Sequence, residues 1–212
     1  MSYKIRYKLT DQNMQTYKGY PWKLNVWQEP IGDSQELCAP GLLHGYIHPL
    51  VAVLMNPIHA NIINPRLFKC EVKGEHLDDH GLKEGWKFMR LVEEIPVPDI
   101  SLIQEIAFGI LCALEVFTKY NFVQWAEDWL SGKDRRAKSA SRIVFAAEYA
   151  TLNGKYSTEY AALAAEYSAH SADESFARFA AKYAALAAAE YAVLAREKIN
   201  LIHIAKQAMK VK

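Results

Sequence analysis

The hydrophobic period of this chain changes near residue 99, and this change limits the folds that the chain can adopt. Before it, apolar and basic residues alternate, as in YKIRYKL at positions 3–9. A period of two is typical of a half-buried strand. After it, apolar residues recur at helical spacing. The sequence therefore predicts an α+β protein, with a small N-terminal mixed or antiparallel sheet domain followed by an α-helical C-terminal half.

The N-terminal pattern also predicts which strand faces are buried. In the stretch 3–9 we expect the tyrosines, Ile5 and Leu9 to point inward and the lysines and Arg6 to point outward. LFKCEVK, at 67–73, alternates in the same way and predicts a second strand with Phe68, Cys70 and Val72 inward. WKFMRLVEEI, at 86–95, has apolar residues on both faces, which favours a more central strand. His48-Pro49 predicts the start of a short helix, because proline suits the first helical position.

Three regions follow from these patterns. Residues 1–98 are expected to form the β-rich domain, and residues 99–132 to form buried helices that pack on it. The stretch 98–120 is apolar nearly all round, which is typical of a buried helix. Residues 133–212 are rich in alanine and tyrosine and predict a helical hairpin or bundle. Asn153-Gly154 predicts a break in this region, and Ser171 with Glu174 predicts a helix cap.

The C-terminal tyrosines leave two interpretations open. Because alanine buries little area, we expect the tyrosines to carry most of the apolar surface of these helices and to pack between them. The alternative is a partner surface, since tyrosine buries area while its hydroxyl stays wet. That surface could also join two copies of the chain into a homo-oligomer. The tyrosines concerned are at positions 149, 156, 160, 167, 183 and 191.

Composition narrows the functional classes. The 212 residues carry a formal net charge of +1, which gives no general attraction to nucleic acid or membranes. Three widely spaced cysteines, without a CxxC pair, do not predict a disulfide framework. No apolar run reaches the length of a membrane span. We expect a cytoplasmic protein, in the host cytoplasm if a phage encodes it, that binds neither nucleic acid nor membranes.

Histidines are gathered in LCAPGLLHGYIHPLVAVLMNPIHANIINPRLFKCEVKGE, at 37–75. His44 and His48 are four residues apart, as in a zinc-binding helix. Gly45 and Pro49 make a continuous helix through both histidines improbable, and no acidic residue lies between them. We therefore predict no metal site and no bound cofactor.

The same stretch carries a resemblance. Together with YKLTDQNMQTYKGYPW at 7–22, RLVEEIPVPDIS at 90–101 and FGILCALEV at 108–116, it resembles a family of uncharacterised proteins from bacteria and their phages. The resemblance covers residues 3–132. It implies no established activity.

The order of segments also resembles the ADP-ribosyltransferase fold. YKIRYK, at 3–8, is similar to that fold's first strand and supplies Arg6, and LVEEIPVP, at 91–98, is similar to its glutamate-bearing strand. The place of the Ser-Thr-Ser motif is held by residues 43–45, Leu-His-Gly, and Val92 holds the place of the substrate-directing Glu or Gln. The resemblance implies a catalytic set rebuilt around Glu94, His44 and His48. In such transferases a carboxylate stabilises the cation-like ribose as nicotinamide leaves.

Two functions remain. We favour a non-enzymatic binding or interaction protein, of phage or bacterial origin, that engages a host protein or a nucleotide. The alternative is an NAD-dependent ADP-ribosyltransferase-like enzyme, or a binder of NAD or ADP-ribose. Besides Glu94, His44 and His48, the candidate ligand contacts are Arg6, Tyr46 and Trp22, the last of which could stack on a base or a nicotinamide.

Overall fold

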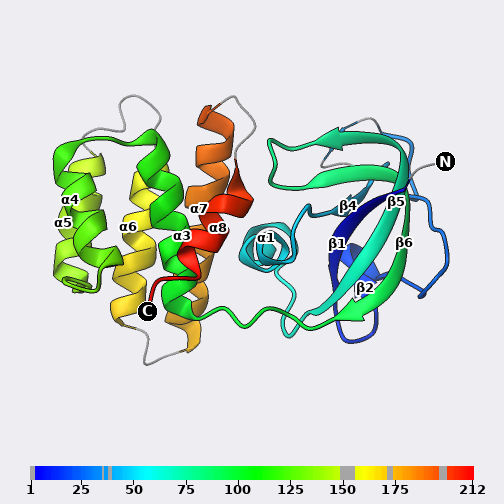
Figure 1. The fold of residues 1–212 in the computed structure, drawn as a ribbon, viewed down its shortest axis with the longest axis horizontal. Helices are drawn as coiled ribbons and strands as arrows, with labels where there is room; N and C mark the ends of the chain where they lie inside the picture. The colour runs from blue at the N-terminus through cyan, green and yellow to red at the C-terminus, as the bar shows by residue number, and fades with distance from the viewer. Residues whose placement is uncertain (1–2, 35, 38–39, 149–155, 171–173, 196–199) are drawn as a thin grey trace. The chain divides into compact units, whose positions relative to one another are not determined.

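The chain forms two compact units, Met1–Asp99 and Ile100–Lys212. The structure, a computed structural model, describes residues 3–34, 36–37, 40–148, 156–170, 174–195 and 200–212. The first unit contains an antiparallel sheet and the second is helical, which confirms the predicted α+β class (Figure 1). The expected break at Asn153-Gly154, the expected cap at Ser171, and Tyr149 lie outside the described residues.

The first unit is built on a four-stranded antiparallel sheet with the order β1-β5-β6-β4. The strands are β1 (Lys4–Thr10), β4 (Leu43–Gly45), β5 (Arg66–Asp78) and β6 (Glu84–Ile95). The prediction that the 86–95 stretch is a central strand is confirmed, since β6 lies between β5 and β4. Beyond β4, the same edge of β6 is covered by a loop in which Leu24 bridges Leu91 and Gln28 bridges Met89.

The two edge strands of this sheet are joined, so the sheet curls on itself. Tyr46, the residue after β4, exchanges two backbone hydrogen bonds of 2.8 Å with Tyr7 of β1. Beside this bridge, the Arg6 guanidinium donates to both carboxylate oxygens of Glu84, at 2.6 and 2.7 Å. Trp86 Nε1 donates to the same carboxylate at 2.8 Å. β1 is thus tied to β4 by its backbone and to β6 by an ion pair.

Strand register decides which side chains lie inside the curl. Lys8 pairs with Phe68, and Arg6 pairs with Cys70. Residues directly opposite each other in an antiparallel pair point to the same face. Phe68 and Cys70 belong to the core of this unit, so the basic side chains of β1 share the inner face with them. The core cluster comprises Trp22, Leu43, Phe68, Cys70, Val72, Trp86, Met89 and Leu91.

Burial confirms one predicted strand face and overturns the other. Phe68, Cys70 and Val72 are buried, as expected. In β1, by contrast, Lys8 is only 7% exposed, whereas Ile5 is 39% exposed. The expectation that the basic residues of β1 point outward is therefore wrong at Lys8 and Arg6, because the curl of the sheet turns that face inward. Leu9 is buried, as expected.

Short elements complete the first unit. The hairpin of β2 (Gln15–Thr16) and β3 (Tyr20–Pro21) encloses a 3₁₀ turn, η1 (Tyr17–Gly19). The helix predicted at His48-Pro49 is α1 (Pro49–Leu54), and His48 Nδ1 caps it by accepting from Leu50 N–H at 3.2 Å. A second short helix, α2 (Asn56–His59), follows directly.

The second unit is a bundle arranged around the helix that the sequence predicts to be buried, α3. The capping box of Ser101 and Gln104 begins α3. α3 packs against α6, α7 and α8, and the expectation that residues 99–132 pack on the sheet stays a prediction. The helices are α3 (Leu102–Val116), α4 (Tyr120–Leu130), α5 (Ala137–Glu148), α6 (Tyr156–Ala169), α7 (Glu174–Ala195) and α8 (Leu201–Ala208).

Small residues let these helices approach closely, and half-buried tyrosines stack where α6 meets α7. Ala161, Ala165, Ala184 and Ala188 are all buried. Tyr160, Tyr167 and Tyr183 are only half-buried, and their rings lie 5.3–6.1 Å apart in a stacked row. The ring of Tyr183 on α7 thus stacks on two tyrosines of α6, as the expected packing between helices requires, although all three rings stay half-buried. Tyr191 is buried, whereas Tyr156 is exposed.

Membrane-spanning helices are not found among the described residues, since none of the helices there is both long enough and apolar enough to cross a bilayer.

The ion pair at the closure of the sheet gives the first prediction. Replacing Glu84 by Gln leaves the Arg6 guanidinium, whose side chain is 14% exposed, without its counter-ion. Breaking such a pair should cost about 3 kcal/mol of unfolding free energy, measured by urea denaturation. Glu94→Gln is the matched control, because the Glu94–Arg66 pair has the same two-pronged geometry but a Glu94 side chain that is 47% exposed. It should cost less than about 1 kcal/mol. Equal losses in the two variants would contradict this account of the closure.

The α3–α7 contact gives the second prediction. A Cβ atom built on Gly109 would lie 2.7 Å from Ala184 Cα and 2.9 Å from Ala184 O, both backbone atoms of α7. Although alanine is favoured over glycine within a helix by about 1 kcal/mol, Gly109→Ala should destabilise the protein by about 1–3 kcal/mol through overpacking. Thermal unfolding checks this. A raised melting temperature would show that the helices are not in close contact there.

Candidate functional site

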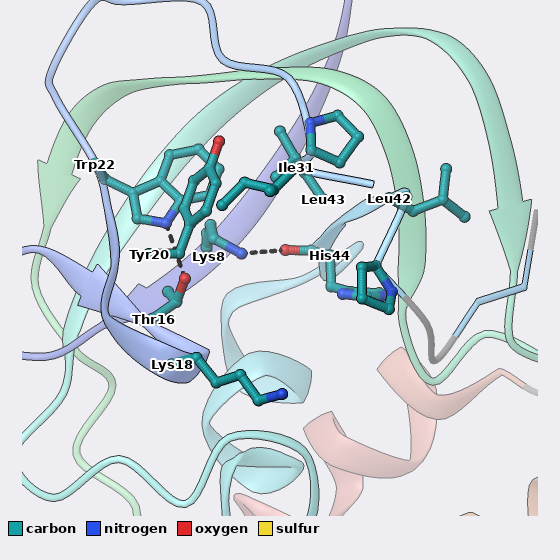
Figure 2. Close-up of a pocket in the computed structure, with 12 residues that line it drawn as sticks. Lys8, Thr16, Lys18, Tyr20, Trp22, Ile31, Leu42, Leu43 and His44 are labelled. Atoms are coloured by element: carbon teal, nitrogen blue, oxygen red, sulfur yellow. Dashed lines mark hydrogen bonds between the residues drawn. The ribbon is translucent and has the colours of Figure 1, made fainter. Parts of the chain in front are cut away.

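Two cavities in the first unit share Lys8, Thr16 and His44 as wall residues. The first has a volume of about 320 Å³ and the second of about 360 Å³. The first is also lined by Lys18, Tyr20, Trp22, Pro30, Ile31, Pro40, Gly41, Leu42 and Leu43. The second is also lined by Leu9, Tyr46, Ile58, His59, Ala60 and Lys83. Figure 2 shows the first cavity, with Tyr20, Trp22 and Thr16 on one side and Leu43 and His44 on the other.

Lys8 lies between β4 and an aromatic wall of the first cavity, which Tyr20 and Trp22 form. Its ammonium donates to the His44 carbonyl oxygen at 2.7 Å and lies 4.7 Å from the centre of the Trp22 ring (Figure 2). No carboxylate within the described part of the chain forms an ion pair with it. An ammonium has three N–H donors, and the described protein groups accept from one of them. The remaining donors are available to a molecule in either cavity.

Burial changes the acid–base behaviour of this lysine. Removal from water lowers the pKa of Lys8 to about 8, because desolvation penalises the charged amine. The nearby Cys70 opposes this effect, but burial raises the pKa of that thiol to about 12. With this pKa roughly a tenth of Lys8 is uncharged at pH 7, and this fraction can act as a nucleophile or a base.

The aromatic wall is itself fixed by hydrogen bonds. Trp22 Nε1 donates to Thr16 Oγ1 at 3.0 Å, and the Tyr20 hydroxyl donates to the Glu29 carbonyl at 2.6 Å. The two rings lie 5.4 Å apart with a 58° tilt. Because Thr16 accepts from Trp22, its own hydroxyl proton can be donated into either cavity.

His44 presents an uncharged imidazole to both cavities. Its Nε2 lies against the carbonyl oxygen of Leu37, which can only accept, so Nε2 carries the proton and Nδ1 is an acceptor. Burial is the largest influence and lowers the pKa of His44 to about 4, despite the Leu37 hydrogen bond. His44 is therefore neutral near pH 7.

A second neutral histidine lines the larger cavity together with Tyr46. His59 Nδ1 lies 3.3 Å from the Tyr46 hydroxyl, and the two rings are stacked with centres 5.9 Å apart. Burial lowers the pKa of His59 to about 3 and raises the pKa of Tyr46 well above its usual range. The larger cavity is thus lined by polar groups that are uncharged at neutral pH, alongside Lys8 and Lys83.

The residues predicted from the sequence fall into two groups. His44, Tyr46 and Trp22 line the cavities. Glu94, Arg6 and His48 line neither of the two. Arg6 is engaged by Glu84, and His48 caps α1.

Glu94 occupies a different environment from the one expected. It pairs with Phe68 at the far end of β6 from Gly85, the partner of His44. The Arg66 guanidinium donates to both of its oxygens and lowers the pKa of the carboxyl. The structure therefore does not place Glu94 in the cavities with His44.

Lys8, Thr16 and His59 are the site residues that sequence reasoning missed. Lys8 looks like one member of an alternating strand, and its burial depends on the curl of the sheet. His59 lies in NPIHAN, at 56–61, where Pro57 indicates a turn. The sequence signal available for His59 is its position shortly after the helix predicted from His48-Pro49, which is α1.

No group of three or more His, Cys, Asp or Glu side chains that could hold a metal ion is found in the described ranges.

Comparison of the chain with protein-family models, with curated proteins and with solved structures finds no match.

The depressed pKa of Lys8 gives a prediction for stability against pH. Its folded pKa of about 8 is below the ordinary value of 10.5, so between these values the unfolded chain holds a proton that the folded chain has released. Unfolding free energy therefore rises with pH in this window. Between pH 7 and pH 9.5, the unfolding free energy of the unmodified protein should rise by about 2 kcal/mol more than that of a Lys8→Met variant.

Urea denaturation of both proteins at the two pH values measures this difference. Lys23→Met, at an exposed lysine of the same unit, is the control and should follow the unmodified protein. If the unfolding free energy of Lys8→Met rose with pH as much as that of the unmodified protein, Lys8 would not be the source of the pH dependence.

Proposed function

We propose that the first unit is a binding module for a small molecule with a flat apolar body and one anionic group. The observation that carries the proposal is the Lys8 ammonium, buried at the wall of two cavities with one hydrogen bond to the described protein groups. Burying an ammonium is costly unless it is paired. A ligand that supplies an anion at this point supplies the missing partner.

The surroundings of Lys8 support the choice of ligand. Tyr20, Trp22 and Leu43 give the first cavity an apolar and partly aromatic wall, which suits a flat ring. Lys8 and Thr16 both have N–H or O–H donors free for the ligand, and a carboxylate accepts several hydrogen bonds at once. A small aromatic acid therefore fits the groups present.

Cavity size separates this candidate from larger ones. A volume of about 320 Å³ is near the lower limit of the range of roughly 300–1,000 Å³ for small-molecule pockets. This favours a ligand of one or two rings over a dinucleotide such as NAD. A mononucleotide, with a base to stack and a phosphate for Lys8, remains a candidate of the same chemistry.

The transferase alternative has less support. It needs a carboxylate beside the reacting ribose, and the glutamate that would supply it, Glu94, is engaged by Arg66 away from His44. We therefore favour binding over catalysis.

A matched pair of probes tests the proposal. Naphthalene-2-carboxylate and naphthalene-2-carboxamide have the same ring, but only the first is charged. Titrated into the ¹⁵N-labelled protein at pH 7, the acid should bind about tenfold or more tightly than the amide, because a charge-assisted hydrogen bond contributes about 1.5–3 kcal/mol. The amide signals of Thr16, Leu43 and His44 should shift.

Variants connect the preference to Lys8. Lys8→Met should remove the preference for the acid, whereas Lys23→Met should keep it. Equal affinities for acid and amide in the unmodified protein would contradict the proposal. Incubation with NAD tests the transferase alternative. If the protein releases nicotinamide and Glu94→Gln abolishes the release, the protein is an enzyme and the binding proposal is wrong.

A further inference from the structure

We propose that Lys8 is also a covalent capture site for small aromatic aldehydes, which it binds as an imine. The inference rests on the proposed function in one respect, since the aldehyde must enter the cavity proposed for the aromatic acid. It goes further by assigning a reaction to the amine.

The two cavities give the reaction separate places for its parts. The aldehyde ring fits the first cavity, against Tyr20 and Trp22, and its carbonyl carbon then faces Lys8. The second cavity shares Lys8, Thr16 and His44 with the first and is also lined by the polar groups Tyr46 and His59. Water released by the reaction can leave into that space.

Lys8 is available as a nucleophile because no ion pair has to be broken first. Its hydrogen-bond acceptor is a neutral carbonyl, that of His44. An amine surrounded by apolar groups loses its proton more easily than an exposed one, and this is a known way to activate lysine for imine formation. The lowered pKa agrees with the geometry.

The bonds and protons balance without any further reactant. The neutral Nζ donates its lone pair to the aldehyde carbon, forming the C–N bond, and a proton moves from nitrogen to the former carbonyl oxygen. The resulting hydroxyl takes a second proton and leaves as water while the C=N bond forms, and the nitrogen releases its remaining proton. His44, which lines both cavities and whose Nδ1 is unprotonated, is the base that accepts and returns these protons. The products are one imine and one water, and nothing is oxidised or reduced.

Reductive trapping tests the inference on the full chain. The protein is incubated with benzaldehyde and sodium cyanoborohydride at pH 7.5, and the modified lysines are identified by peptide mass spectrometry. Lys8 should be modified about tenfold or more faster than the exposed Lys23, because the aldehyde is held in the cavity beside Lys8. The rate at Lys8 should level off above pH 8 to 9.

Competition and a conservative variant complete the design. Naphthalene-2-carboxylate should slow the modification of Lys8 and leave that of Lys23 unchanged. Lys8→Arg keeps the charge but cannot form an imine, so this variant should lose the fast modification.

The outcomes separate the two proposals. Modification of Lys8 at the rate of Lys23 or slower, while the acid still binds, overturns the imine and leaves the binding function. Fast modification that the acid does not slow overturns the shared cavity. Failure of both acid binding and fast trapping removes both proposals.

Discussion

The curl of the N-terminal sheet depends on where β4 is inserted. Three residues, Leu43–Gly45, pair with β6, and the next residue, Tyr46, pairs with β1. Joining the two edges in this way satisfies backbone groups that an open edge would expose. It also turns one face of β1 inward, and that face carries basic residues. The buried Lys8, the ion pair of Arg6 and both cavities follow from this closure.

The hydrophobic period and the position of proline in the sequence predict much of the fold. The alternation at 67–73, the two-sided apolar run at 86–95 and the proline after His48 each predict an element that the structure contains. What they cannot predict is which face of β1 is the inner one. A period of two defines two faces, and the choice between them depends on pairing with Phe68 and on the bridge to Tyr46, which are contacts far apart in the sequence.

The candidate site shows the same limit. Trp22, His44 and Tyr46 could be named because aromatic and imidazole groups are chemically conspicuous in a sequence. Lys8 could not, because an alternating lysine is usually solvated and its burial is a property of the closed sheet. The local motif makes Glu94 a candidate catalytic residue. The motif does not predict that Glu94 pairs with Arg66, because this ion pair depends on the register between β5 and β6.

The alanine-rich packing of the second unit has a consequence for how α3 and α7 are aligned. Alanine side chains present a nearly repeating surface after each helical turn, about 5.4 Å along the axis, so large interlocking side chains are not there to select one alignment. Gly109 supplies a notch where the backbone of Ala184 approaches within the space of a missing methyl group. Sliding α7 by about a turn would bring another alanine, Ala180 or Ala188, towards this notch in place of Ala184. Gly109 therefore sets how closely the two helices approach, and the repeat of alanine along α7 leaves their alignment along the axis to contacts elsewhere in the bundle.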